Sequence, residues 1–386
     1  MTLFDVDIND LRSNQGIKWN RYPRDVIPTW VADMDFRIAA PIQEYLQSLS
    51  HTGNLRYTKA APGSAVCEAF AERMQNRYGW SPDPAEMDCM ADIVQGINIA
   101  VNVLCAPDEQ VILHTPLYHP ILTACHTFKR QILYNPLIRG ESQWELDFDR
   151  LEAEITPRTR LLMLVNPHNP SGRVFDRAEL ERMAEVVIRH DLYVVADEIH
   201  CDLLFDNAPD FVPFASIDPE ITRRTVTFNS ATKSYNLGGV RCSVAHYGSA
   251  ELRRRFEQFP AGLRGGANAI GAGATVTAWK HCDDWLNALI PYLQDNRDYL
   301  VNFLAQRLPD IIHIPNQSTF LAWLDCNALE LEEEAYDFFL REARVGFNAG
   351  PDFGPEGTGH VRLNFATSKA VLTEILERME KAVARL

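Results

Sequence analysis

The sequence of 386 residues lacks the features that mark several large classes of protein. It has no basic run and a formal net charge of −15, so phosphate backbones and anionic lipids are repelled, and we expect no nucleic-acid partner and no membrane. No apolar stretch approaches the length of a membrane span, and the N-terminus carries no signal-like apolar core. A cytoplasmic protein is therefore predicted.

Cysteine motifs and repeats are also missing. The eight cysteines include no C-x-x-C pair and lie mostly in apolar segments, which predicts reduced thiols in the core and no metal site. The chain contains no internal repeat, low-complexity tract or flexible linker. With 46% hydrophobic and 23% charged residues, its composition is typical of a globular enzyme with one large or two moderate domains.

The order of the apolar runs predicts an α/β fold. From about residue 90, short apolar runs alternate with helical periods, which is typical of a mostly parallel sheet covered by helices. Strands are expected at 111–114, 161–165, 193–197, 225–228 and 243–247, and helices at 96–105 and 178–190. We assign a large domain to residues 46–279.

The two ends of the chain are predicted to form a small α+β domain, from residues 1–45 and 280–386. Residues 27–36 favour an extended path and an edge strand, and Ser64 is expected to begin a helix that ends at Gly79. The C-terminal pattern predicts helices at 285–308 and 333–343, strands at 320–325 and 361–365, and an amphipathic final helix.

The stretch from Asn229 to Arg241 follows a predicted buried strand and combines a hydroxyl, an amine and a guanidinium. Desolvation at the strand end lowers the pKa of Lys233, and a neutral amine attacks a carbonyl to form a Schiff base. Ser230 and Arg241 would hold a phosphate beside it, which suggests pyridoxal 5′-phosphate. Ser-x-x-Lys also occurs in serine acylases, but their Ser-Asp-Asn and Lys-Thr-Gly signatures are missing.

Three further polar residues lie in or just after predicted strands. Asp197 ends an apolar run and needs a cation, such as a pyridinium nitrogen, although a turn-capping role fits it equally well. Asn169, in a turn, has an amide donor for the phenolic oxygen of the cofactor. Arg362 lies among apolar neighbours and suits an amino-acid carboxylate, with a structural ion pair as the alternative.

Taken in order, these motifs resemble those of fold-type I pyridoxal-phosphate enzymes of the class I/II aminotransferase superfamily. The similarity is greatest to the cystathionine β-lyase (C–S lyase) branch of the MalY/PatB type, whose fold is like that of aspartate aminotransferase. It runs nearly end to end and is carried by Trp30–Phe36, Asn166–Pro170, Asp197–His200 and Val361–Asn364.

The resemblance implies a role for each matching position. The catalytic residues would be Lys233, Asp197 and Tyr118. The cofactor would be bound by Gly96, Ile97, Tyr118, Asn169, Asp197, His200, Ser230, Lys233, Arg241 and Tyr57. The substrate would be bound by Arg362, Asn169, Ala32 and Tyr57.

Some of these roles are specific. Gly96 and Ile97 open a predicted helix and would offer backbone N–H groups to the phosphate. Tyr118 would stack on the pyridine ring, whereas a core tyrosine is the alternative. Tyr57 would reach the phosphate of a neighbouring subunit, so the resemblance implies a homodimer with shared active sites. His200 lies where many aminotransferases carry a tyrosine.

The chain departs from its relatives at Gln95, His119, Ser318 and Phe320, positions expected to surround the substrate. The resemblance implies α,β-elimination from cystathionine or another S-substituted L-cysteine, giving a thiol, pyruvate and ammonia. The alternatives are an aminotransferase, and a biosynthetic enzyme that acts on a bulky cysteine S-conjugate by elimination or by decarboxylation with oxidative deamination. A fourth possibility is a protein that modulates a transcription activator by contact.

Overall fold

A seven-stranded sheet forms the centre of the computed structural model, which describes residues 4–13, 16–57 and 63–386. Its strand order is β2-β10-β9-β8-β7-β3-β4, and only β10 runs antiparallel to its neighbours. The strands are β2 (Met87–Met90), β3 (Gln110–Leu113), β4 (Gln131–Tyr134), β7 (Thr159–Val165), β8 (Tyr193–Asp197), β9 (Thr225–Asn229) and β10 (Ser243–Tyr247). The five predicted strands and the predicted fold class are confirmed.

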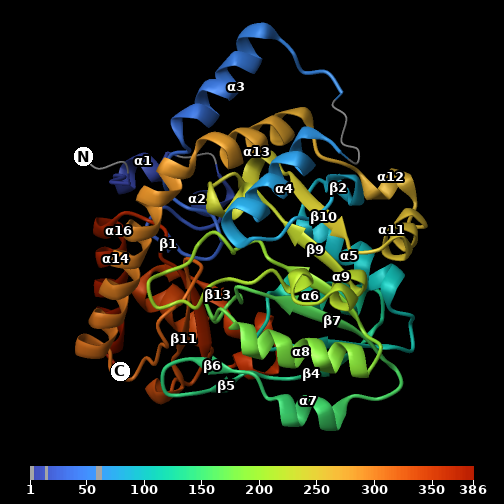
Figure 1. The fold of residues 1–386 in the computed structure, drawn as a ribbon. Helices are drawn as coiled ribbons and strands as arrows, with labels where there is room; N and C mark the ends of the chain where they lie inside the picture. Colours follow the sequence, from blue (N-terminus) through green and yellow to red (C-terminus); the bar gives the residue numbers. More distant parts are fainter. Residues whose placement is uncertain (1–3, 14–15, 58–62) are drawn as a thin grey trace.

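Helices cover both faces of this sheet (Figure 1), because alternate side chains of its strands enter separate hydrophobic clusters. One cluster joins the sheet to α5 (Ile93–Leu104), α6 (His119–Thr127) and α11 (Ala250–Glu257). The opposite cluster joins it to α7 (Phe148–Glu154), α8 (Arg177–Arg189) and α9 (Pro219–Arg224). Near β2 and β10 the sheet is covered by α4 (Ala65–Tyr78) and α13 (Ala269–His281).

The C-terminal part of the chain has an α+β arrangement, as expected. An antiparallel sheet of order β11-β14-β13 shares a hydrophobic cluster with two long helices. These elements are β11 (Leu321–Asp325), β13 (Asn348–Ala349), β14 (His360–Asn364), α14 (Asp283–Arg307) and α16 (Lys369–Val383). Pro291 lies inside α14, and α15 (Ala335–Phe338) continues as a π-helix over Phe339–Ala343. The division of the chain into two domains remains a prediction.

Two predicted boundaries are wrong. In the segment 27–36, only β1 (Ile27–Pro28) is a strand, paired with β12 (Val345–Gly346). Further along, the carbonyls of Val31, Ala32 and Met34 accept from side chains instead of pairing with a strand. The helix expected at 96–105 begins at Ile93, since Asp92 is its N-cap and accepts from the Gln95 amide. The eight cysteines are buried and free, as predicted.

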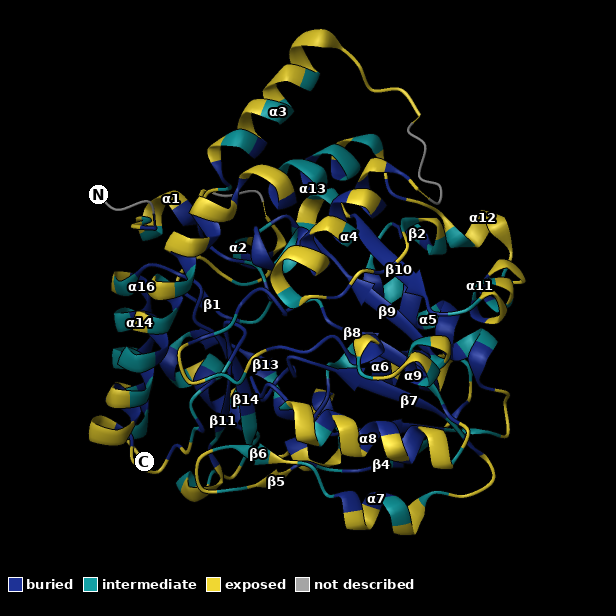
Figure 2. Cartoon of the chain, viewed as in Figure 1, coloured by how far each residue is buried: buried dark blue, intermediate teal, exposed yellow. Residues whose placement is uncertain are grey.

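The remaining elements are short, except for α3 (Ala40–Thr52), which projects from the body of the molecule and is mostly exposed (Figure 2). They are α1 (Ile8–Arg12), α2 (Ile17–Asn20), α10 (Ala231–Ser234), α12 (Ala261–Arg264) and the hairpin of β5 (Ile138–Arg139) and β6 (Trp144–Glu145), with short 3₁₀ helices at Pro84–Glu86, Phe214–Ser216, Gly238–Val240, Asn327–Leu329, Gly350–Phe353 and Pro355–Gly357. Among the described helices, none is both long and apolar enough to span a bilayer.

Candidate active site

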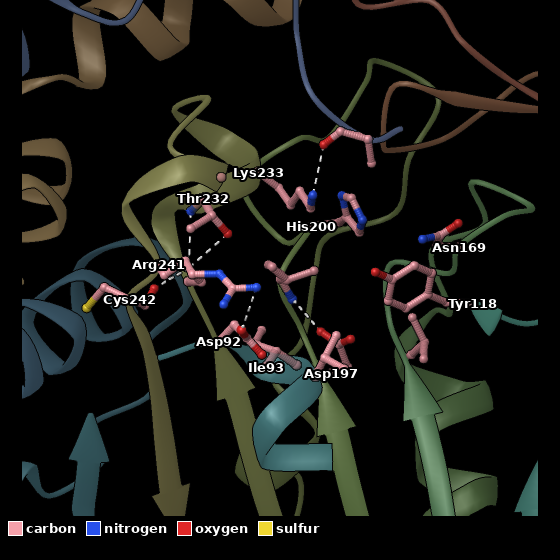
Figure 3. A pocket seen from close by; sticks show the side chains of 16 residues that line it. Asp92, Ile93, Tyr118, Asn169, Asp197, His200, Thr232, Lys233, Arg241 and Cys242 are labelled. Carbon is pink, nitrogen blue, oxygen red and sulfur yellow. Dashed lines mark hydrogen bonds and ion pairs between the residues drawn. The ribbon is translucent and has the colours of Figure 1, made fainter. Parts of the chain in front are cut away.

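A cavity of about 300 Å³ lies at the carboxyl ends of β7, β8 and β9 (Figure 3). In open α/β sheets this is the edge where ligands bind. The cavity brings together eight of the predicted site residues, which are Ala32, Tyr118, Asn169, Asp197, His200, Ser230, Lys233 and Arg241. Gly96, Ile97, Tyr57 and Arg362 do not line it.

Lys233 is placed by the junction between β9 and α10, where Ser230 is the N-cap and accepts from the Thr232 amide. Its Nζ donates a hydrogen bond to the Ala32 carbonyl oxygen at 2.8 Å. Burial lowers the pKa of Lys233, and the nearby Asp33 carboxylate opposes that shift. The amine therefore loses its proton more readily than a lysine on the surface.

Asp197 is the last residue of β8, and its side chain is buried. One carboxylate oxygen accepts from the Ile199 amide at 3.2 Å, so the capping role considered from the sequence is present. Burial raises the pKa of Asp197 to about 6, while Lys233 acts in the opposite direction. Above that pH the cavity holds a buried carboxylate, which a cationic ligand group would stabilise.

Arg362, on β14, is 2% exposed and bonds only to neutral oxygens within the described residues. Its guanidinium donates to Asn169 Oδ1 at 3.0 Å, the Trp30 carbonyl at 2.9 Å and Asn348 Oδ1 at 2.6 Å. Burial lowers the pKa of Arg362 to about 10, and its Nε is buried without a partner among the residues that the structure describes. The ion pair considered as an alternative is not formed in the described chain.

Asn169 connects this guanidinium to the cavity. Its Oδ1 accepts from Arg362, which leaves its amide group as a donor toward the cavity. Its carbonyl accepts from the Tyr118 amide at 3.1 Å, and Tyr118 is the N-cap of α6. Arg362 thus lies one layer behind the cavity wall, in contact with a residue that lines it.

The opposite end of the cavity is more exposed. The side chain of Arg241 is 68% exposed and lies 3.4 Å from an Asp92 carboxylate oxygen. The Ser230 hydroxyl lies 2.6 Å from the Cys242 carbonyl and 3.0 Å from Thr232 Oγ1, with one hydrogen to donate between them. A phosphate bound beside Ser230 would accept the hydrogen bond from its hydroxyl in place of these two oxygens.

The placement expected for Gly96 and Ile97 at a helix start is wrong. Both lie in the second turn of α5, where the Gly96 amide donates to the Asp92 carbonyl and Ile97 is fully buried. A Cβ at Gly96 would lie 2.5 Å from the Phe228 ring, so this glycine serves helix packing. The residues that open α5 and line the cavity are Ile93 and Val94.

His200 is buried beside the Lys233 amine (Figure 3), and burial lowers its pKa to about 3. It is therefore neutral, and its Nδ1 has no partner among the described residues. Two positions that depart from the relatives lie behind it: the Phe320 ring is 6.2 Å from the His200 ring, and Ser318 Oγ is 3.4 Å from the His200 carbonyl.

The other two departures also contact the cavity wall from outside it. His119 packs against Tyr118 at 5.3 Å between ring centroids, and the backbone amide of Gln95 donates to the side chain of Asp92, which lines the cavity. None of the four departures lines the cavity in the described chain; each contacts a residue of its wall. Their place around a bound substrate remains a prediction.

Tyr57 lies elsewhere on this chain. Its side chain is fully exposed and borders a separate hollow between α3 and α13, with Tyr45 and Gly273. The described chain alone does not bring it to Lys233, and its role across a subunit boundary remains a prediction.

Sequence reasoning missed the other residues of the wall, which are Asp92, Ile93, Val94, Val165, Ile199, Thr232, Gly238 and Cys242. A signal was present for the first three, because an aspartate followed by an apolar helical run is a typical N-cap pattern. Asn348 was also missed, since its two-residue strand leaves no periodicity to detect.

The comparisons with known proteins agree with this geometry. The family model for aminotransferase class I and II matches residues 22–379, so the chain belongs to that family. Cystathionine beta-lyase PatB of Bacillus subtilis is 32% identical over 381 residues, covering 96% of this chain and 97% of the relative. The predicted family is confirmed.

Two solved structures extend the similarity to the fold. OvoB is 34% identical with a TM-score of 0.93, and 99% of each chain is covered. The PLP-bound C–S lyase of Staphylococcus hominis is 29% identical with a TM-score of 0.92, and 98% of each chain is covered.

Proposed function

We propose that this protein is a pyridoxal-phosphate-dependent C–S β-lyase, which cleaves cystathionine or another S-substituted L-cysteine to a thiol, pyruvate and ammonia. The observation that carries the proposal is a buried lysine of lowered pKa beside a buried carboxylate. One layer behind them lies an arginine with no carboxylate partner among the described residues. Its relatives named cystathionine beta-lyase and C–S lyase, similar over nearly the whole chain, support this reaction.

The described residues fit the cofactor. Lys233 would bind it covalently, Asp197 would face its ring nitrogen, and Asn169 and His200 offer polar groups to its ring. Tyr118 would stack on that ring. The phosphate would bind where Ser230, Thr232 and Arg241 meet the amino end of α5, so the amides of Ile93 and Val94 replace those expected from Gly96 and Ile97.

The bound cofactor supplies an electron sink that stabilises negative charge at the substrate Cα. The chain orients and deprotonates the substrate. A substrate carboxylate would displace one of the neutral acceptors of Arg362, because a charge-assisted hydrogen bond is stronger than a neutral one. Lys233 Nζ, released from the cofactor when the substrate amine replaces it there, would take the proton from Cα, and the Asp33 carboxylate would stabilise the ammonium that results.

A homodimer with shared active sites forms part of the proposal. The mostly exposed α3 and the exposed Tyr57 beside it support it, since both belong to one projecting region of the chain. In a dimer, Tyr57 would reach the phosphate end of the neighbouring subunit. The cytoplasmic location remains a prediction.

Turnover without an acceptor tests the reaction. Purified enzyme is mixed with L-cystathionine and a set of S-substituted cysteines in the absence of any 2-oxo acid, and we expect sustained release of thiol, pyruvate and ammonia. Arrest after one equivalent, relieved by a 2-oxo acid, would make the protein an aminotransferase. Carbon dioxide and hydrogen peroxide would indicate oxidative decarboxylation.

Borohydride reduction followed by peptide mapping is expected to fix the cofactor on Lys233, and a label elsewhere contradicts the assignment.

A further inference from the structure

Asn348 holds Arg362 from the neighbouring strand. The register of β13 and β14 places the two residues directly opposite each other, and Asn348 Oδ1 accepts from the guanidinium at 2.6 Å. Asn348 is itself buried, at 9% exposure. Its position across the sheet, not a flexible loop, therefore fixes one side of the guanidinium.

The surroundings of Arg362 contain no negative partner in the part of the chain that the structure describes. The two other acceptors, Asn169 Oδ1 and the Trp30 carbonyl, are neutral, and the Phe353 ring lies 4.9 Å from the guanidinium carbon. Buried charges are usually paired, and the chain carries 52 acidic residues. Within the described chain, the positive charge of Arg362 is thus not compensated by a carboxylate.

We propose that Asn348 is a positioning residue that sets the ligand charge accepted by Arg362: its carboxamide fixes the guanidinium without neutralising it, and so reserves Arg362 for a carboxylate. This inference rests on the proposed role of Arg362 as the substrate-carboxylate anchor. A ligand carboxylate displaces a neutral acceptor with a net gain, because the new bond is charge-assisted. In Asn348→Asp, a carboxylate of the same shape as the carboxamide would already make a charge-assisted bond to Arg362. A ligand carboxylate would then gain nothing by displacing it.

The test is equilibrium binding of a carboxylate that has no amine, measured by calorimetry on the cofactor-loaded enzyme with 3-(methylthio)propionate. Asn348→Asp is expected to weaken binding about 100-fold, as when a buried charge pair at a binding site is disrupted. The melting temperature of the same variant is expected to stay or rise, because a buried cation gains a partner. In turnover with S-substituted cysteines, KM rises more than kcat falls.

Three matched variants make the result decisive. Asn287→Asp adds the same charge at an exposed position of α14 and is expected to bind the probe as the wild type does. Asn348→Ser keeps a neutral acceptor but shortens it, and is expected to weaken binding about tenfold, the loss of one hydrogen bond to a charged group. Arg362→Ala is expected to abolish binding.

The outcomes separate this inference from the proposed function. Binding by Asn348→Asp equal to that of the wild type, with binding lost in Arg362→Ala, overturns the role of Asn348 alone. Should Asn348→Asp not fold, unchanged binding by Asn348→Ser overturns the positioning role. Probe binding that does not depend on Arg362 refutes the carboxylate anchor itself, and with it the basis of the inference.

Discussion

The two arginines near the cavity are held in opposite ways. Arg241 is largely exposed and pairs with the Asp92 carboxylate, whereas Arg362 is buried among neutral oxygens. An exposed ion pair is screened by water and contributes little, but a buried cation without a counter-charge interacts strongly with any anion that reaches it. Position in the fold, not residue type, therefore decides how much each arginine contributes to ligand binding.

Removal of the buried arginine is expected to have the largest effect. Arg362→Ala should lower kcat/KM for S-substituted cysteines about 1,000-fold, mainly through KM, because a buried charged contact to the substrate is lost. Arg362→Lys should restore only part of it, since an ammonium cannot form the bidentate contact. Steady-state kinetics and cofactor titration measure both quantities. Loss of cofactor with unchanged substrate affinity would make Arg362 a structural residue.

The buried end of the cavity also contains Asp197, whose charge costs stability when no ligand compensates it. Its pKa is raised from 3.8 to about 6, so its contribution to stability is greatest below pH 3.8 and is lost as the pH rises through about 6. In cofactor-free protein, Asp197→Asn should therefore raise the free energy of unfolding at pH 8 by about 3 kcal/mol and have little effect near pH 4. Denaturant unfolding at the two pH values measures this, and an equal change at both contradicts the electrostatic cause.

The exposed end predicts a smaller change. Arg241→Ala should weaken cofactor binding by less than about tenfold, as for other exposed charge pairs. Added salt should reduce the difference between this variant and the wild type, because exposed charges are screened, while leaving the defect of Arg362→Ala nearly unchanged. Cofactor titration of Arg241→Ala and the substrate KM of Arg362→Ala, each measured at two salt concentrations, test the contrast. A salt-independent defect at Arg241 would mean that the ligand buries it.

The sequence predicted the exposed end less well than the buried one, for a physical reason. Lys233, Asp197 and Asn169 follow regular buried strands, so the ends of those strands fixed their place. The exposed end depends on where α5 begins. The sequence placed that start at Gly96, whereas the helix begins at Ile93 and Gly96 packs closely against Phe228.

Other features depend on contacts between distant parts of the chain and left no pattern to read. The segment from Trp30 to Phe36 looked like a strand because its residues alternate, yet its carbonyls bond to side chains such as Asn236 and Asn364. One neutral acceptor of Arg362, Asn348, is placed by the pairing of β13 with β14, and a strand of two residues has no detectable period.

The smallest expected effect distinguishes the two arginines by their influence on Lys233. The positive charge of Arg362 lowers the pKa of Lys233, and the Asp33 carboxylate raises it. Arg362→Ala should therefore raise the pKa of Lys233, and Asp33→Asn should lower it, because each removes one of these charges. Arg241→Ala should leave it unchanged, since Arg241 is exposed and screened. In cofactor-free protein, the rate at which Lys233 reacts with an amine-selective reagent, followed by peptide mapping across a pH series, gives the midpoint for each variant. Equal shifts from both arginine variants would mean that the pKa of Lys233 depends on the total charge near the cavity. The distinction between its buried and exposed ends would then be wrong.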